Sequence, residues 1–188
     1  MASELQVQTI SGPPTGANAN KILIPSGQTL FAPGHVIQVV NSILTTTMSW
    51  TGTTAIQNIL SANITPKFST SKILVQCHVQ LAAQHGMQNI ITLTMDRNGT
   101  KIAANTSGGA TANQSAWGCY GGPSYADSGR IQEMFSLNYL DSPSTASSLT
   151  YTLGGRLDQG ANTAYVGRWS LNNDSANVTT LTLMEIAA

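Results

Sequence analysis

The chain has 188 residues, enough for one sizeable domain and an appendage but short for two full domains. Charged residues make up only 9% of it, and 8 Lys plus Arg balance 8 Asp plus Glu. A net charge of zero offers no field to attract nucleic acid or an anionic membrane, so neither is expected as a partner. The Ser, Thr, Asn, Gln and Gly that replace the missing charge suit strands and turns, which predicts an all-β protein.

The start of the chain, MASELQVQTI, has neither the basic residues nor the apolar run of a signal peptide. No stretch reaches the roughly 18 apolar residues that span a bilayer. We therefore expect a protein made in a cytoplasm and not exported by itself.

Residues 1–33 read as an extended N-terminal arm that cannot form a core of its own. The stretch 11–20, SGPPTGANAN, is rich in Gly, Pro and Asn. After it, two short β-type runs at 21–24 and 29–31 flank a turn at Pro25, Ser26, Gly27 and Gln28. This pattern predicts a small β-hairpin within the arm.

Residues 34–188 read as one β-sandwich domain, because strand patterns and turn signals alternate at short spacing. The clearest strand is SKILVQCHVQLA, where alternate apolar residues share one face. In chain order, strands are expected at 35–44, 59–66, 71–82, 89–96, 100–104, 132–141, 148–157, 163–171 and the closing segment 178–188. About eight or nine strands without a helix predict an antiparallel β-sandwich of the jelly-roll type.

Two connections between these strands carry a local prediction. The Asn98-Gly99 pair between the fourth and fifth expected strands favours a tight hairpin turn. By contrast, residues 105–130 form a long glycine-rich segment, read as an irregular loop that is functional or packed on a neighbour. Its Trp117, Tyr120 and Tyr125 are candidates for stacking on a sugar or anchoring an interface, or else they cap the end of the sandwich.

No catalytic or metal-binding pattern is present in the sequence. The histidines His35, His78 and His85 are scattered, and the eight acids suggest no pair suited to sugar hydrolysis. Of the two cysteines, Cys77 is read as core and Cys119 as loop packing, with a disulfide disfavoured in a reducing compartment. We expect no enzyme activity, no metal and no cofactor.

Several strands have apolar residues on both faces, whereas a single sandwich buries only one. In the first strand Val39 and Ile43 lie opposite Val40 and Leu44, and Leu140 lies opposite the inward set of its own strand. Either loops cover the second set, or other copies of the chain do through a closed symmetric contact. We expect an oligomer.

Five blocks of the sequence resemble a family of virion structural proteins from tailed phages of aquatic bacteria, especially cyanophages. In order, they are GHVIQVV (34–40), ITPKFSTSKILVQCHVQLA (64–82), MDRNGTKIA (95–103), SLNYLDSPSTASSLTYTL (136–153) and TLTLMEIAA (180–188). Members of that family are capsid decoration proteins or tail-fibre modules, and they tend to be trimeric and β-rich. The resemblance therefore implies a homotrimeric virion component, assembled in the host cytoplasm and located on the capsid or the tail.

Fibre members of the family often follow a shaft, which this chain lacks, so the expectation tilts to a capsid decoration (cement) protein bound to the major capsid protein. Its arm would bind the shell through the apolar residues Ile22, Leu23, Ile24, Leu30 and Phe31. Alternatively, the arm packs on its own trimer. The alternative functions are a short tail fibre that recognises host surface glycan through Trp117, Tyr120 and Tyr125, and a hydrolase of host polysaccharide.

Overall fold

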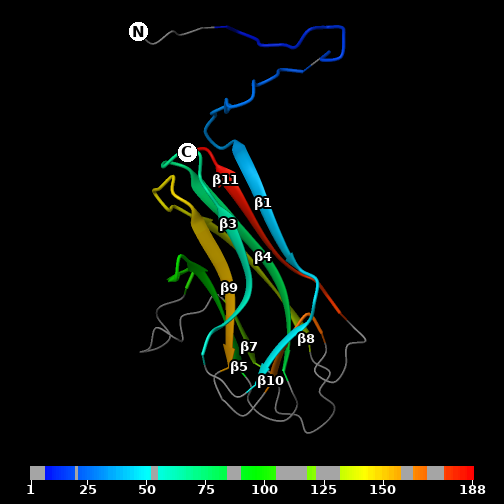
Figure 1. Cartoon of the computed structure of the whole chain (residues 1–188), viewed down its shortest axis with the longest axis vertical. Coiled ribbons are helices and arrows are strands. Elements are labelled where there is room, and N and C mark those ends of the chain that lie inside the picture. The colour runs from blue at the N-terminus through cyan, green and yellow to red at the C-terminus, as the bar shows by residue number, and fades with distance from the viewer. Residues whose placement is uncertain are drawn as a thin grey trace.

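The protein is an all-β sandwich with an N-terminal arm that projects from one end (Figure 1). The computed structural model describes residues 7–19, 21–51, 55–83, 90–104, 118–121, 132–157, 163–168 and 176–188. Within these ranges the chain forms eleven strands in two antiparallel sheets and no helix. The all-β prediction is confirmed.

The first sheet contains six strands but is only four strand positions wide. They are β1 (Val36–Leu44), β2 (Met48–Thr51), β4 (Lys72–Ala83), β8 (Gln132–Asp141), β10 (Thr163–Val166) and β11 (Thr179–Ile186). Strand β8 pairs with β4 along nearly its whole length, so β11 and β10 share the other edge of β4, one after the other. Strands β1 and β2 pair with β11 and β10 in the same way, which gives the order β1/β2, β11/β10, β4, β8.

The second sheet repeats this plan with five strands. They are β3 (Gln57–Ile64), β5 (Ile90–Arg97), β6 (Thr100–Ile102), β7 (Gly118–Gly121) and β9 (Leu149–Leu157). Strand β9 lies between β3 and β5, while β6 and β7 share the far edge of β5.

The two sheets together have eight strand positions with the connectivity of a jelly roll. Numbered in chain order, the eight positions are β1/β2, β3, β4, β5, β6/β7, β8, β9 and β10/β11. In this numbering the first sheet has the order 1, 8, 3, 6 and the second has the order 2, 7, 4, 5. The predicted fold class is thus confirmed. The eleven strands exceed the expected eight or nine because three of the eight positions are interrupted.

The core lies between the sheets and is built from alternate residues of each strand. On β4, all five residues predicted to face inward are fully buried, namely Ile73, Val75, Cys77, Val79 and Leu81. Strands β3, β5, β9 and β11 contribute the other large fully buried side chains, including Leu93, Leu153 and Leu183. Burying these apolar side chains is the main driving force for the fold.

The hairpin turn predicted at Asn98-Gly99 is present between β5 and β6. Both residues have positive φ, 49° at Asn98 and 79° at Gly99, as the tight turn of this class requires. The Asn98 side chain also accepts a hydrogen bond from the backbone N–H of Thr150, at 2.8 Å, which joins the turn to β9.

Two short strands were not predicted. Strand β7 lies within the segment expected to be wholly irregular, so that expectation is wrong at residues 118–121. Strand β2 carries the buried Trp50, whose ring packs closely on Gly155, where an added Cβ would lie 3.0 Å from a ring carbon. Tertiary pairing with a long neighbour stabilises these four-residue strands, which have no strong local signal.

The arm is extended and turns back on itself, as Figure 1 shows at its outer end. Gly12 lies so close to Lys21 that an added Cβ would clash with the Lys21 backbone. Nearer the sandwich, the predicted turn is present, with Gln28 N–H donating to the Pro25 carbonyl at 3.0 Å and Gly27 at φ 84°. Residues 21–24 and 29–31 nevertheless form no strand, because an isolated hairpin is marginal in water.

Cys77 provides a test of the core by pH. Burial raises the pKa of its thiol from 9.0 to about 12, so between these pH values only the unfolded chain loses the proton. The free energy of unfolding should therefore fall in that window by about 1.4 kcal/mol per pH unit through this group alone. In Cys77→Val, which keeps a similar volume, we expect that slope to be smaller by this amount in urea unfolding measured across the window. Parallel curves for the variant and the native chain would contradict the assignment.

Candidate assembly surfaces

The root of the arm is held by the last residues of the chain. Gly34 N–H donates to the Ala187 carbonyl at 2.7 Å, and Ala187 N–H donates to the His35 carbonyl at 2.9 Å. These bonds extend the pairing of β1 with β11 by one step beyond the ends of both strands. The point at which the arm leaves the sandwich is thus fixed by the C-terminus.

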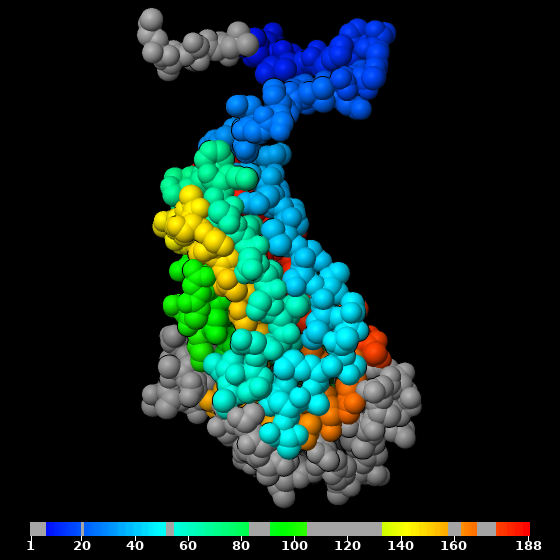
Figure 2. Space-filling model, viewed as in Figure 1, coloured from blue at the N-terminus to red at the C-terminus, as the bar shows by residue number. Residues whose placement is uncertain are grey.

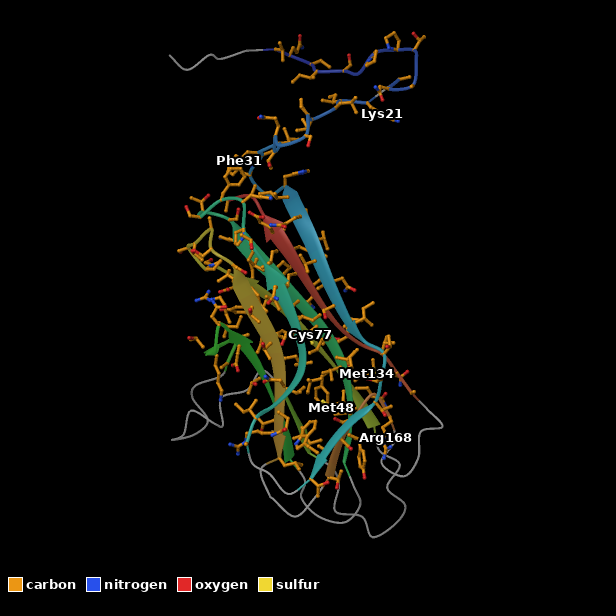
Figure 3. The ribbon with its side chains drawn as sticks, in the orientation of Figure 1. Lys21, Phe31, Met48, Cys77, Met134 and Arg168 are labelled. Atoms are coloured by element: carbon orange, nitrogen blue, oxygen red, sulfur yellow. The ribbon has the colours of Figure 1, made fainter. Side chains whose placement is uncertain are left out.

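An aromatic contact holds the arm at the same place, where it joins the sandwich. Phe31 packs edge-to-face on Phe68, with ring centroids 4.9 Å apart and an interplanar angle of 79°. Phe68 belongs to the connection between β3 and β4, so the contact ties the arm to a third segment. Figure 3 shows Phe31 at the top of the sandwich and Lys21 far out along the arm.

Glu185 organises the connection on which Phe31 rests. This β11 side chain faces inward and is fully buried. Its carboxylate accepts hydrogen bonds from Gln38 Nε2 at 2.6 Å and from the backbone N–H groups of Lys67 and Phe68 at 2.7 and 3.3 Å. Three donors compensate for the burial of the carboxylate, and they fix residues 67 and 68 relative to β1 and β11.

The arm itself presents apolar side chains to solvent. All five residues predicted to bind a partner are exposed, from 44% at Ile24 to 60% at Leu23. The structure does not gather them into one cluster, and of the five only Phe31 has an aromatic contact with the sandwich. In Figure 2 the arm stands clear of the body beyond its root.

A second apolar surface lies on the outer face of the first sheet, near the root of the arm. The pairing register places one residue from each of four strands in a row across this face: Val39, Met184, Leu74 and Leu140. Val39 and Leu140, at the two ends of the row, are exposed. The apolar residues predicted on both faces of the first strand and of β8 are therefore present, and within the described residues nothing covers them fully.

The next row of the same face is polar. Asn41 donates to Thr182 Oγ1 at 2.7 Å, and Gln76 donates to Asn138 Oδ1 at 2.9 Å. One row further, His78 and Ser136 are joined at 2.8 Å. On this face the apolar row therefore lies beside two rows of mainly amide, hydroxyl and imidazole side chains, and Lys72 lies on its other side.

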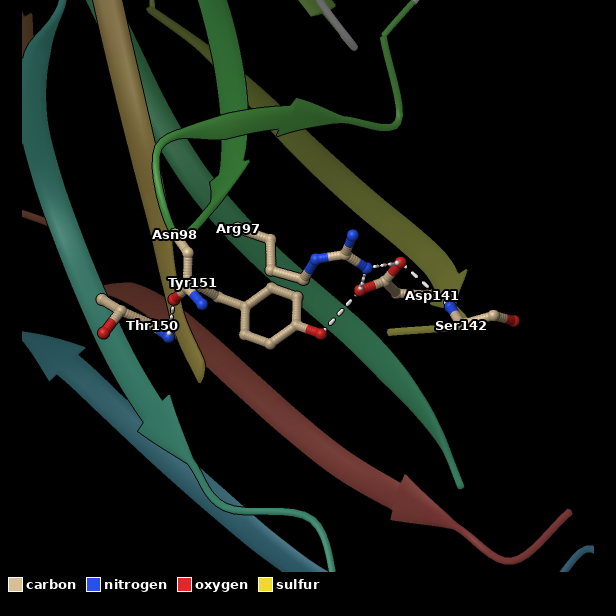
Figure 4. A network of polar contacts seen from close by, with 6 residues as sticks. All are labelled: Arg97, Asn98, Asp141, Ser142, Thr150 and Tyr151. Atoms are coloured by element: carbon tan, nitrogen blue, oxygen red, sulfur yellow. Dashed lines mark hydrogen bonds and ion pairs between the residues drawn. The ribbon is translucent and has the colours of Figure 1, made fainter. Parts of the chain in front are cut away.

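A partly buried ion pair joins the two sheets at the end nearest the arm (Figure 4). Asp141, at the end of β8, accepts from Arg97 Nη1 at 2.8 Å, from Tyr151 Oη at 2.7 Å and from the Ser142 N–H at 2.9 Å. Burial, together with the bond to Asp141, raises the pKa of the Tyr151 phenol. Because the Asp141 carboxylate and the Tyr151 hydroxyl both have partners, this network ties β5 and β9 to the end of β8 and offers no free acid or base.

The aromatic residues proposed for sugar stacking are only partly placed. Tyr120 lies in β7, opposite Ile91 on β5, but its side chain is outside the described part of the structure. Trp117 and Tyr125 lie outside the described residues altogether. A glycan site in this segment stays a prediction.

Clustered metal ligands and membrane-spanning helices are both absent from the described ranges. Nowhere in them do three His, Cys, Asp or Glu side chains gather in a way that would hold a metal ion. The same ranges include no helix of the length and hydropathy needed to cross a membrane.

Comparisons with known proteins give a fold likeness only. No family model matches the chain, and no curated protein matches it. Among solved structures it is similar to a chain of infectious bursal disease virus Gt strain, with a TM-score of 0.41 and 11% identity over 89% of this chain. It is also similar to the infectious bursal disease virus VP2 subviral particle, with a TM-score of 0.42 and 10% identity over 94% of this chain. The protein spans 42% and 45% of those chains, less than half their length, and at these TM-scores the likeness carries no argument about function.

Replacing Glu185 by Gln tests whether its carboxylate organises the arm root. Gln has the same shape, but its NH₂ must meet one of the donors that now bind the carboxylate. We expect a loss of about 1–3 kcal/mol in the free energy of unfolding and faster amide exchange at Lys67 and Phe68.

Glu133→Gln is the matched control, because Glu133 is exposed at the start of β8. It should change neither quantity. Equal effects from both variants would show that Glu185 has no special role.

Proposed function

We propose that this protein is a non-enzymatic virion component, a homotrimeric capsid decoration protein whose N-terminal arm binds the major capsid shell. The observation that carries the proposal is that the arm is exposed and apolar while its root is firmly held on the sandwich. The resemblance of five sequence blocks to virion structural proteins supports the same assignment.

The arm is suited to binding something larger than the sandwich. Its main-chain groups at 22–24 and 29–31 belong to no strand, so they can join a neighbouring sheet. In such a strand Ile22 and Ile24 would share one face, while Leu23 would lie on the other. Backbone bonds would supply the affinity and these side chains the register.

The held root matters for the same function. A flexible joint would lose conformational freedom when the arm binds, and that loss would lower the affinity. The part of the arm next to the sandwich is already held in place. It is held by the backbone bonds at Gly34 and Ala187, by the Phe31 ring and, through residues 67 and 68, by the Glu185 carboxylate. The arm thus begins from a preorganised position.

Deleting residues 1–33 tests the proposal. The core lies wholly in the sandwich, so the truncated protein should fold and keep its oligomeric state, while its binding to purified phage heads that lack the protein should be lost. Sedimentation of heads with the bound protein measures the occupancy. Unchanged occupancy would overturn the proposed role of the arm.

A finer variant separates apolar contact from the mere presence of an arm. Replacing Ile22, Leu23 and Ile24 together by Ser should reduce head occupancy strongly, because it removes the exposed apolar side chains and keeps the backbone. A control with Thr15→Ser and Asn18→Ser changes the arm at polar positions and should bind like the native chain. Equal loss in both would argue against recognition through the apolar segment.

A further inference from the structure

Strand β8 has the features of a strand that lacks its second neighbour. It is ten residues long and lies at the edge of the first sheet, and among the described residues it pairs only with β4. Within the described part of the chain, its other edge therefore presents unpaired backbone groups. Native proteins usually protect such an edge with charge, proline or a bulge, and the register of β8 with β4 has no bulge and its central residues include neither charge nor proline.

Both faces of β8 are also incompletely covered. On the outer face Met134 is 63% exposed and Leu140 49% exposed. On the inner face Phe135, Leu137 and Tyr139 pack against the core but are only partly buried, whereas the inward residues of adjacent β4 are fully buried. The sandwich is thus open along this edge.

The order of residues along β8 is symmetric about Leu137. On either side of Leu137 come a polar residue, an aromatic residue and a large apolar residue, which gives Met-Phe-Ser-Leu-Asn-Tyr-Leu over residues 134–140. If a second copy paired antiparallel with this edge and was centred on Leu137, Met134 would face Leu140, Phe135 would face Tyr139 and Ser136 would face Asn138. Every pair would then join side chains of the same kind on the same face.

Charge permits this contact between identical chains. No charged residue lies between positions 134 and 140. In the symmetric pairing Glu133 would face Asp141, and the charge of Asp141 is already compensated by Arg97 at 2.8 Å. Two copies can therefore approach without unpaired like charges at the contact, and a strongly charged partner would find nothing complementary.

We propose that the β8 edge is a two-fold contact between two copies of this chain, paired antiparallel about Leu137. The first sheets of the two copies would then form one continuous sheet, eight strand positions wide. The partly buried aromatic residues of each copy would complete the core of the other.

This contact goes beyond the proposed function and does not depend on it. A two-fold contact cannot close a trimer, so in the proposed homotrimer it would link one copy in each of two trimers, for example where neighbouring trimers meet on a shell. It can be tested in solution without phage heads, so failure here is distinguishable from failure of the shell-binding proposal.

Cysteine cross-linking tests the register directly, in a background with Cys77→Val and Cys119→Ser. In the proposed pairing position 137 faces itself, at the Cα separation of about 4.5–5.5 Å found in antiparallel pairs, which a disulfide can span. Leu137→Cys should therefore give a disulfide-linked dimer when an oxidant is added. A dimer should not form with Ser61→Cys, which is exposed on the other sheet.

A second pair of variants is independent of any effect that Leu137→Cys has on folding. Ser136→Cys and Asn138→Cys lie on the outer face, and each is about 7–8 Å from its own copy in the partner, too far for a disulfide. Each alone should therefore stay unlinked, whereas a mixture of the two should give a linked dimer. Linkage of each alone, or no linkage in the mixture and in Leu137→Cys, would overturn the proposal.

The mass in solution gives the third measurement. Met134→Lys with Leu140→Lys, the seam variant, places charge at the proposed contact between copies. We expect the native chain to form even-numbered assemblies of its basic unit at high concentration, and we expect the seam variant to form none of them. Ser61→Lys is the control and should leave the mass unchanged. If native and seam variant have the same mass at every concentration, the contact does not form.

Discussion

Strand β11 lies between β1 and β4 and hydrogen-bonds to both of them, so the end of the chain completes the sheet that the beginning of the domain starts. Its inward side chains Leu181 and Leu183 are fully buried in the core. The same strand carries Glu185 and is followed by Ala187, which hold the root of the arm. The fold and the position of the arm thus depend on one strand pairing, and a weakened β11 would release both.

Much of this arrangement could be predicted from alternation and turn chemistry. The strand at 132–141 has the predicted bounds, the inward set of β4 is the predicted one, and Asn98-Gly99 forms the expected turn. These succeed because each depends on a local pattern: a two-residue period on a half-buried strand, or a pair of residues that tolerate positive φ.

The remaining features depend on partners distant in sequence. Trp50 marks the short β2 only because Gly155, about a hundred residues away, leaves space for its ring. The hairpin expected in the arm lacks a third segment to stabilise its strands. Glu185 was missed as part of the arm root, although its parity with Leu181 and Leu183 already placed it on the inward face. Phe68 had no such signal.

The molecule combines a buried core with two surfaces that no described residue fully covers, the apolar arm and the β8 edge. Both are uncharged over their central residues, which suits contacts with other protein chains rather than with nucleic acid. An assembly protein would need both features, one surface for the shell and one for its own copies.

The number of copies per purified virion, measured by mass spectrometry against the major capsid protein, tests this account most directly. A decoration protein predicts a copy number comparable to that of the shell subunits. A handful of copies would instead assign it to the tail, and complete absence from virions would contradict the account.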